Sequence, residues 1–81
     1  MTWSKDLKPL GLRYMADDDY IGAIRSFEMA IRINSDDAEA YYNLGIAYSK
    51  LGKRADALKQ YKVLKTLNPK KARELYHYIN P

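Results

Sequence analysis

Residues that carry out covalent or metal chemistry are scarce in this 81-residue chain, which has no cysteine and one histidine, His77. The absence of cysteine excludes disulfides, thiolate zinc sites and cysteine nucleophiles. A single histidine leaves the commonest general base nearly absent. No nucleophile or second titrating partner stands at helical spacing from His77, so we expect it to be a groove or surface residue. The composition predicts a protein that is not an enzyme and needs no metal or cofactor.

The densest cluster of carboxylates is the run Asp17, Asp18 and Asp19. A calcium loop of the EF-hand type needs ligands spread over about twelve residues, a central glycine and a terminal glutamate, and none of these is present. Aspartate tolerates the left-handed backbone of a tight turn better than most residues. We therefore expect the run to form a turn rather than a cation site.

The net charge of +4 is unevenly distributed. Residues 1–37 contain five basic and seven acidic side chains, whereas residues 38–81 contain nine and three. Weak contact with nucleic acid or an anionic surface is one interpretation of the basic half, with Tyr42, Tyr76 and Tyr78 stacking bases. Because no RNA-binding signature accompanies these tyrosines, nucleic acid is not the expected partner. We expect instead a solvated convex helix face, formed by Arg54, Lys59, Lys62, Lys65, Lys70 and Lys71.

The chain repeats itself at an offset of 34 residues. A single shift, with no insertion, aligns Leu10 with Leu44, Gly11 with Gly45, Tyr14 with Tyr48, Ala23 with Ala57, Phe27 with Tyr61, Ile33 with Leu67 and Asn34 with Asn68. An offset of this length indicates an internal duplication and is typical of repeat architectures.

Apolar residues at helical spacing predict a helix, a tight turn and a second helix within each copy. In residues 38–67 the turn contains Gly52, a natural left-handed cap. The corresponding turn of the first copy covers residues 16–19. Nine Ala and nine Leu against a single Val also favour helix over sheet.

The expected helix boundaries follow from capping residues and prolines. Ser35 or Asp36 precedes the third helix, and Asp36 with Glu39 has the spacing of a capping box. Asn68 and Pro69 end the fourth helix, because the residue before a proline is displaced from the helical region. Residues 71–79 then form a shorter fifth helix.

Pro9 constrains the first helix, because a proline in the helix interior clashes with the carbonyl four residues earlier. If Asp6 is the N-cap, Pro9 falls in the first turn, where its missing N–H is harmless. The sequence therefore predicts a helix that starts near Leu7, an arm over residues 1–5, and Trp3 folded onto the exposed end of the stack.

With these features the chain resembles the tetratricopeptide repeat family, whose unit is a helix–turn–helix of about 34 residues. The chain departs from the family signature at three positions: Leu7 stands where the family has an aromatic residue, Ser35 where it has proline, and Leu64 where it has alanine. The matching residues are Leu10, Gly11, Tyr14, Ala23, Phe27 and Ala30 in the first copy, and Tyr41, Leu44, Gly45, Tyr48, Ala57, Tyr61 and Pro69 in the second.

The resemblance implies an all-α protein of five helices, in which antiparallel helix-turn-helix repeats stack into a short right-handed superhelix. We expect a single domain over residues 1–81, with repeats at 4–37 and 38–71 and a capping helix at 72–81. The glycines lie where a side chain would separate two helices, and the aromatic residues fill the remaining space. Each hairpin leaves an apolar face that its neighbour must cover.

The resemblance also implies a protein-protein interaction module that binds a short peptide or partner helix in a concave groove. The cationic groove residues and the apolar floor favour acidic or acidic-apolar segments. The expected groove residues are Lys5, Lys8, Leu12, Met15, Tyr42, Asn43, Ile46, Lys50, Arg73, Tyr76 and His77.

A subset of the family holds ligand carboxylates in a clamp of Lys, Asn, Asn, Lys and Arg. Lys8 and Asn43 match this clamp, and Arg73 could replace its second lysine. Leu12 and His77 depart from it, so a looser preference for acidic segments is the better expectation.

Two alternatives stay open at this stage: a unit that associates with itself as a scaffold, and an engineered or excised array without a dedicated ligand. The chain has no stretch of about 20 apolar residues, and residues 1–8 lack the apolar core of a signal peptide. A cytoplasmic protein with protein or peptide partners, and no small-molecule substrate, is expected.

Overall fold

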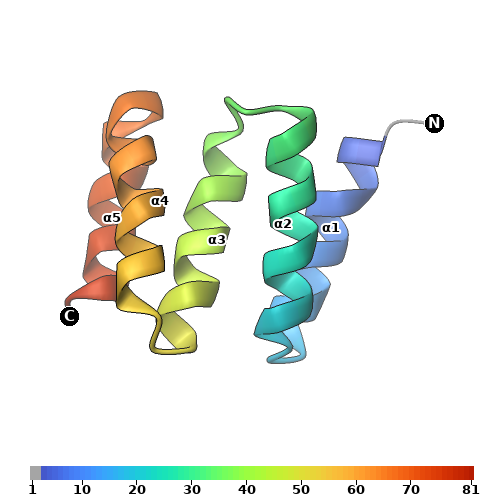
Figure 1. Cartoon of the computed structure of the whole chain (residues 1–81), viewed down its shortest axis with the longest axis horizontal. Helices are drawn as coiled ribbons and strands as arrows, with labels where there is room; N and C mark the ends of the chain where they lie inside the picture. The colour runs from blue at the N-terminus through green and yellow to red at the C-terminus, as the bar shows by residue number, and fades with distance from the viewer. Residues whose placement is uncertain (1–2) are drawn as a thin grey trace.

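Five helices make up the part of the chain that the computed structural model describes, residues 3–81, with side chains from Leu7 onward. They are α1 (Trp3–Ala16), α2 (Tyr20–Ile33), α3 (Ala38–Lys50), α4 (Arg54–Leu67) and α5 (Pro69–Ile79). The helices follow one another along the long axis, with α1 behind α2 and α5 behind α4 (Figure 1). The predicted all-α architecture of five helices is confirmed, and residues 3–81 contain no strand.

Two left-handed residues make the turns within the hairpins. Gly52 has φ +74° and Asp18 has φ +59°. The side chain of Asp19 then caps α2 by accepting a hydrogen bond of 3.0 Å from the N–H of Gly22. The aspartate run therefore forms a turn and a helix cap, as the sequence predicted.

Helix α1 begins earlier than predicted and contains Pro9. The expected arm over residues 1–5 is wrong for residues 3–5, which are helical. Pro9 is the seventh residue of α1, so its missing N–H leaves the carbonyl of Lys5 without an intrahelical hydrogen bond, and the helix nevertheless continues to Ala16. The predicted place of the Trp3 side chain lies outside the described residues.

Two other helix starts also differ from the predictions. Asp37 caps α3, and its Oδ1 accepts a hydrogen bond from the N–H of Ala40 at 3.2 Å, so the expected capping box of Asp36 and Glu39 does not form. Helix α5 starts at Pro69, and the only residue between it and α4 is Asn68. The Asn68 side chain accepts from the N–H of Lys71 at 3.1 Å, and proline suits a first helical position.

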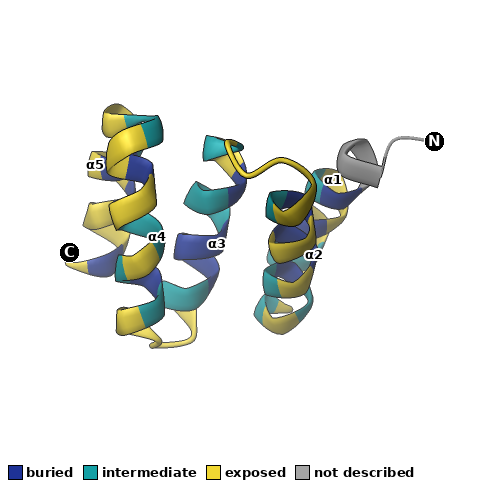
Figure 2. Ribbon diagram, turned by 45° about the horizontal axis from the view of Figure 1, so that its top comes forward, coloured by how far each residue is buried: buried dark blue, intermediate teal, exposed yellow. Residues whose placement is uncertain are grey.

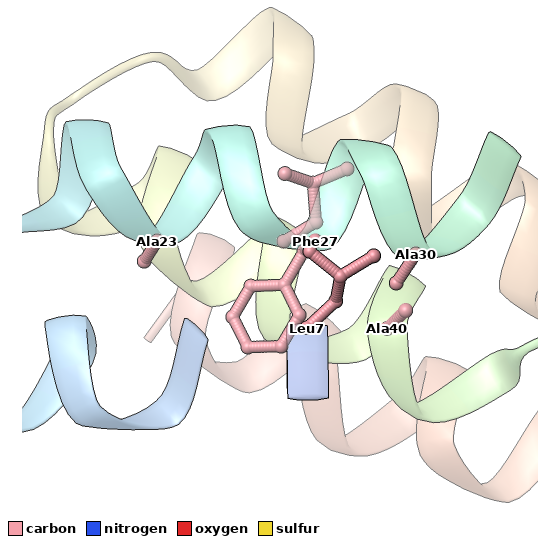
Figure 3. Packing of buried hydrophobic residues seen from close by; sticks show 6 residues of the cluster. Leu7, Ala23, Phe27, Ala30 and Ala40 are labelled. Carbon is pink, nitrogen blue, oxygen red and sulfur yellow. The ribbon is translucent and has the colours of Figure 1, made fainter. Parts of the chain in front are cut away.

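The buried residues, drawn dark blue in Figure 2, form two clusters. In the first, Phe27 is fully buried, and a Cβ at Gly11 would lie 2.7 Å from its ring. In the second, a Cβ at Gly45 would lie 2.5 Å from Leu75. The expected close approach at both glycines is confirmed. The first cluster comprises Leu7, Ala23, Phe27, Ala30, Ala40 and Leu44 (Figure 3), and the second Ile46, Ala57, Leu64, Ala72, Leu75 and Ile79.

Candidate functional site

The candidate site is the inner face, by which we mean the surfaces of α1, α3 and α5 that bear the predicted groove residues. Two stripes at helical spacing contain five of them, together with Glu39. Helix α1 presents Lys8, Leu12 and Met15, and α3 presents Glu39, Asn43 and Lys50. The side chain of Lys5 lies outside the described residues.

Lys8 is engaged by two carboxylates of the chain itself. Its Nζ lies 3.1 Å from Oδ2 of Asp37 and 3.8 Å from Oε1 of Glu39. The Asp37 side chain is only 10% exposed, so little water screens the shorter pair. Lys8 therefore offers less positive charge to an acidic ligand than the sequence predicts. The sequence comparison overlooked that the start of α3 brings two acids to it.

The predicted apolar floor is only partly accessible. Leu12 is 46% exposed, but Ile46, its counterpart at the 34-residue offset, is 8% exposed and belongs to the second core cluster. Met15 is half-buried and packs against both clusters. The expected place of Ile46 on an open floor is thus wrong, because α5 packs extensively on α3.

Tyr42 lies at the seam between α3 and α5. Its ring meets that of Tyr78 edge-on, with the centroids 6.4 Å apart, and Nζ of Lys71 stands 4.6 Å from the Tyr42 centroid. Burial is the main cause that raises the pKa of Tyr42, and the nearby Tyr78 and Glu74 raise it further. Lys71 therefore belongs to this seam and not to the convex basic face on which the sequence placed it.

Tyr76 does not share the environment of Tyr42, its counterpart at the offset. Its ring centroid lies 5.2 Å from that of Tyr61 on α4, so Tyr76 is at the seam between α4 and α5. Tyr78, and not Tyr76, lies beside Tyr42. The sequence signal for this difference was the single residue between Leu67 and Pro69, which makes α5 start three residues early relative to α3.

The remaining predicted residues are accessible in different degrees. Asn43 is half-buried, and its Nδ2 donates a hydrogen bond of 3.0 Å to the carbonyl of Glu39. Lys50, Arg73 and His77 are exposed. Among the side chains from Leu7 onward, neither Lys50 nor Arg73 makes an ion pair. These two cations are therefore free to meet an acidic ligand.

Comparison with known families agrees with the hairpin geometry. A family model described as "TPR repeat" matches residues 11–52, which is more than half of the chain, and one described as "Tetratricopeptide repeat" matches residues 38–71. The chain belongs to the tetratricopeptide repeat family. Tetratricopeptide repeats generally mediate protein–protein interactions and are generally not enzymes. No curated protein matches the chain.

Two hollows of this tetratricopeptide repeat protein lie away from most of the predicted groove residues. One, of about 270 Å³, is lined by Glu28, Ile31, Arg32, Tyr41, Leu44 and Gln60. The other, of about 110 Å³, is lined by Ser49, Gly52, Arg54, Tyr78 and Ile79. Near the first, the Tyr48 hydroxyl donates to Oε2 of Glu28 at 3.3 Å.

Two further findings bear on function. The described residues contain no group of three or more His, Cys, Asp or Glu side chains placed to hold a metal ion. None of the five helices described is long and apolar enough to cross a membrane.

Proposed function

We propose that the chain binds a short acidic or acidic-apolar peptide, or the face of a partner helix, on the α1 and α3 half of the inner face. The observation that carries the proposal is the exposure of Leu12 where its counterpart Ile46 is covered. An apolar side chain of the ligand would cover Leu12 and the edge of Met15. The family's general role in protein–protein interaction supports a partner of this kind.

Charge favours acidic groups beside Lys50, the last residue of α3. Lys8 is neutralised by Asp37 and Glu39, whereas Lys50 has no ion-pair partner among the described side chains. A ligand carboxylate would therefore approach Lys50, because Arg73 lies on α5, outside this half of the inner face. With few anchoring residues, we expect a dissociation constant on the order of micromolar.

The test is a titration of isotope-labelled protein with an acidic-apolar peptide, followed by amide chemical shifts. Shifts at Leu12, Asn43 and Lys50 are expected. A peptide of the same length with lysine in place of the acidic residues should bind at least tenfold more weakly. Shifts confined to Lys59, Lys62 and Lys65 would contradict the proposal.

A matched pair of leucine variants separates the inner face from general apolar contact. Leu12→Asp should weaken binding about tenfold, because it removes the apolar contact and adds a repelling charge. Leu10→Asp is the control, since Leu10 is similarly exposed at 42% but is two residues away and points to another side of α1. Equal losses in both variants would overturn the assignment.

Self-association is a second candidate, favoured by exposed apolar side chains on the first hairpin. Leu10, Met29 and Ile33 are each more than 40% exposed. Light scattering over a concentration series distinguishes the two functions. A dimer in which Leu12 becomes protected would replace the peptide-binding proposal.

A further inference from the structure

A connected row of polar and aromatic side chains runs along α4 and α5. We call it the terminal flank and define it as Arg54, Tyr61, Lys65, Tyr76 and Asn80. Nη1 of Arg54 donates to Oδ1 of Asn80 at 3.4 Å, and Nδ2 of Asn80 donates to the Tyr76 hydroxyl at 3.3 Å. Tyr76 packs on Tyr61, and Nζ of Lys65 stands 5.5 Å from the Tyr61 centroid.

The terminal flank is rich in cations. Lys62 precedes Lys65 by three residues and therefore lies on the same side of α4, and Arg73 precedes Tyr76 by three residues on α5. Lys62, Lys65 and Arg73 are exposed.

The carboxylates of α4 and α5 are directed elsewhere. Asp56 pairs with Lys59 at 3.9 Å and helps to raise the pKa of Tyr48 on α3. Glu74 helps to raise the pKa of Tyr42, which places it on the α3 side of α5. Neither acid neutralises the cations of the terminal flank.

Tyr76 presents an accessible aromatic ring that its neighbours hold in place, beside the Tyr61 ring that Lys65 contacts. It is 37% exposed, it packs against Tyr61 at an interplanar angle of 45°, and its hydroxyl accepts from Asn80. A ring fixed in this way loses little freedom when a flat ligand stacks on it. Proteins that bind single-stranded DNA or RNA without sequence preference use cations beside accessible aromatic rings.

We propose that the terminal flank is a second binding surface, which takes single-stranded nucleic acid by stacking a base on Tyr76 while Lys62, Lys65 and Arg73 contact phosphates. This goes against the expectation from the sequence that nucleic acid is not a partner, because the sequence did not reveal that Tyr76 packs on Tyr61, the ring over which Lys65 stands. A membrane surface would need exposed aliphatic side chains beside the cations, and Leu58, the aliphatic residue of this side, is half-buried.

The test is fluorescence anisotropy of a labelled twelve-nucleotide oligothymidine with the full chain. Binding should weaken with salt, with a log–log slope of about −2 for three phosphate contacts. Tyr76→Leu should weaken binding about tenfold, whereas Tyr76→Phe, which keeps the ring, should bind like the wild type. Tyr78→Leu is the matched control, because Tyr78 lies on the opposite side of the same helix beside Tyr42.

Charge variants complete the test. Lys62→Gln with Lys65→Gln should weaken binding about tenfold. Lys53→Gln with Lys59→Gln removes the same charge from the N-cap of α4 and from another position on that helix, and should weaken binding less than threefold. Circular dichroism checks that each variant is folded. The proposal would be overturned if the two pairs of variants lost the same affinity for the oligonucleotide. It would also be overturned if the protein bound polyglutamate or phosphatidylserine vesicles as tightly as the oligonucleotide, or if it did not bind the oligonucleotide at low salt.

Discussion

Helix α3 has a neighbouring helix of the inner layer on each side, and the two contacts differ. It packs loosely on α1 and extensively on α5. Four residues, 34–37, connect α2 to α3, whereas Asn68 alone connects α4 to α5. The short connection holds α5 close to α3, so Ile46 is covered while Leu12, at the same place in the first copy, stays exposed. Connection length therefore decides which part of the inner face is open.

Equivalent positions approach one another in both contacts, but the type of interaction between them differs. Lys8 pairs with Asp37 at the first contact. At the second, Tyr42 and Lys71 occupy the equivalent positions and form a cation–π contact. The 34-residue offset thus predicts which positions approach one another, but the residue types decide what the contact is.

The largest expected difference between the hairpins concerns their central aromatic residues. Phe27→Ala should lower the free energy of unfolding by about 3–5 kcal/mol, because the ring is fully buried. Tyr61→Ala should cost clearly less, because Tyr61 is half-buried. Urea unfolding followed by circular dichroism measures both. A greater loss for Tyr61→Ala would contradict the comparison.

The next largest difference is expected between the stability losses caused by alanine at the two close-approach glycines, Gly11 and Gly45. In Gly11→Ala the new methyl would meet the rigid ring of Phe27, and the protein should lose about 1–2 kcal/mol after the helix propensity gained by alanine. In Gly45→Ala the new methyl group would meet the δ carbons of Leu75, which can move. Thermal unfolding should therefore show a smaller loss for Gly45→Ala, and the reverse order would be inconsistent with the packing.

Tyr48 packs against both core clusters and should make stability sensitive to alkaline pH. Burial, with Glu28 as the next cause, raises the pKa of Tyr48 to about 12. Above pH 10 the unfolded chain loses this proton while the folded chain retains it, so the free energy of unfolding falls as pH rises through 12. Tyr48→Phe should show a shallower fall in urea unfolding between pH 9 and 11. Identical slopes would refute this assignment.

The smallest expected effects distinguish the two lysine contacts. Lys8→Met and Lys71→Met should each cost about 0.5 kcal/mol at low salt. The cost of Lys8→Met should diminish in 1 M NaCl, because salt screens an ion pair, and that of Lys71→Met should change less. Parallel unfolding curves at the two salt concentrations check this, and equal salt dependence would remove the distinction.

The duplication, the five helices, both left-handed turns and the two glycine contacts could be predicted from the sequence, because each depends on residues close in the chain or on the 34-residue offset. The offset failed at α5, where Asn68 both ends one helix and caps the next, and Tyr76 and Ile46 were misplaced as a result. The pairing of Lys8 with Asp37 could not be predicted either, since it depends on how α3 approaches α1.

The most direct test of the account uses the absence of cysteine in the chain. Single thiols introduced as Leu12→Cys and Ile46→Cys report how accessible the two equivalent positions are to a labelling reagent. The thiol at position 12 should react at least tenfold faster than the thiol at position 46. Equal rates would mean that α5 does not cover α3, and the assignment of the open surface to α1 and α3 would be wrong.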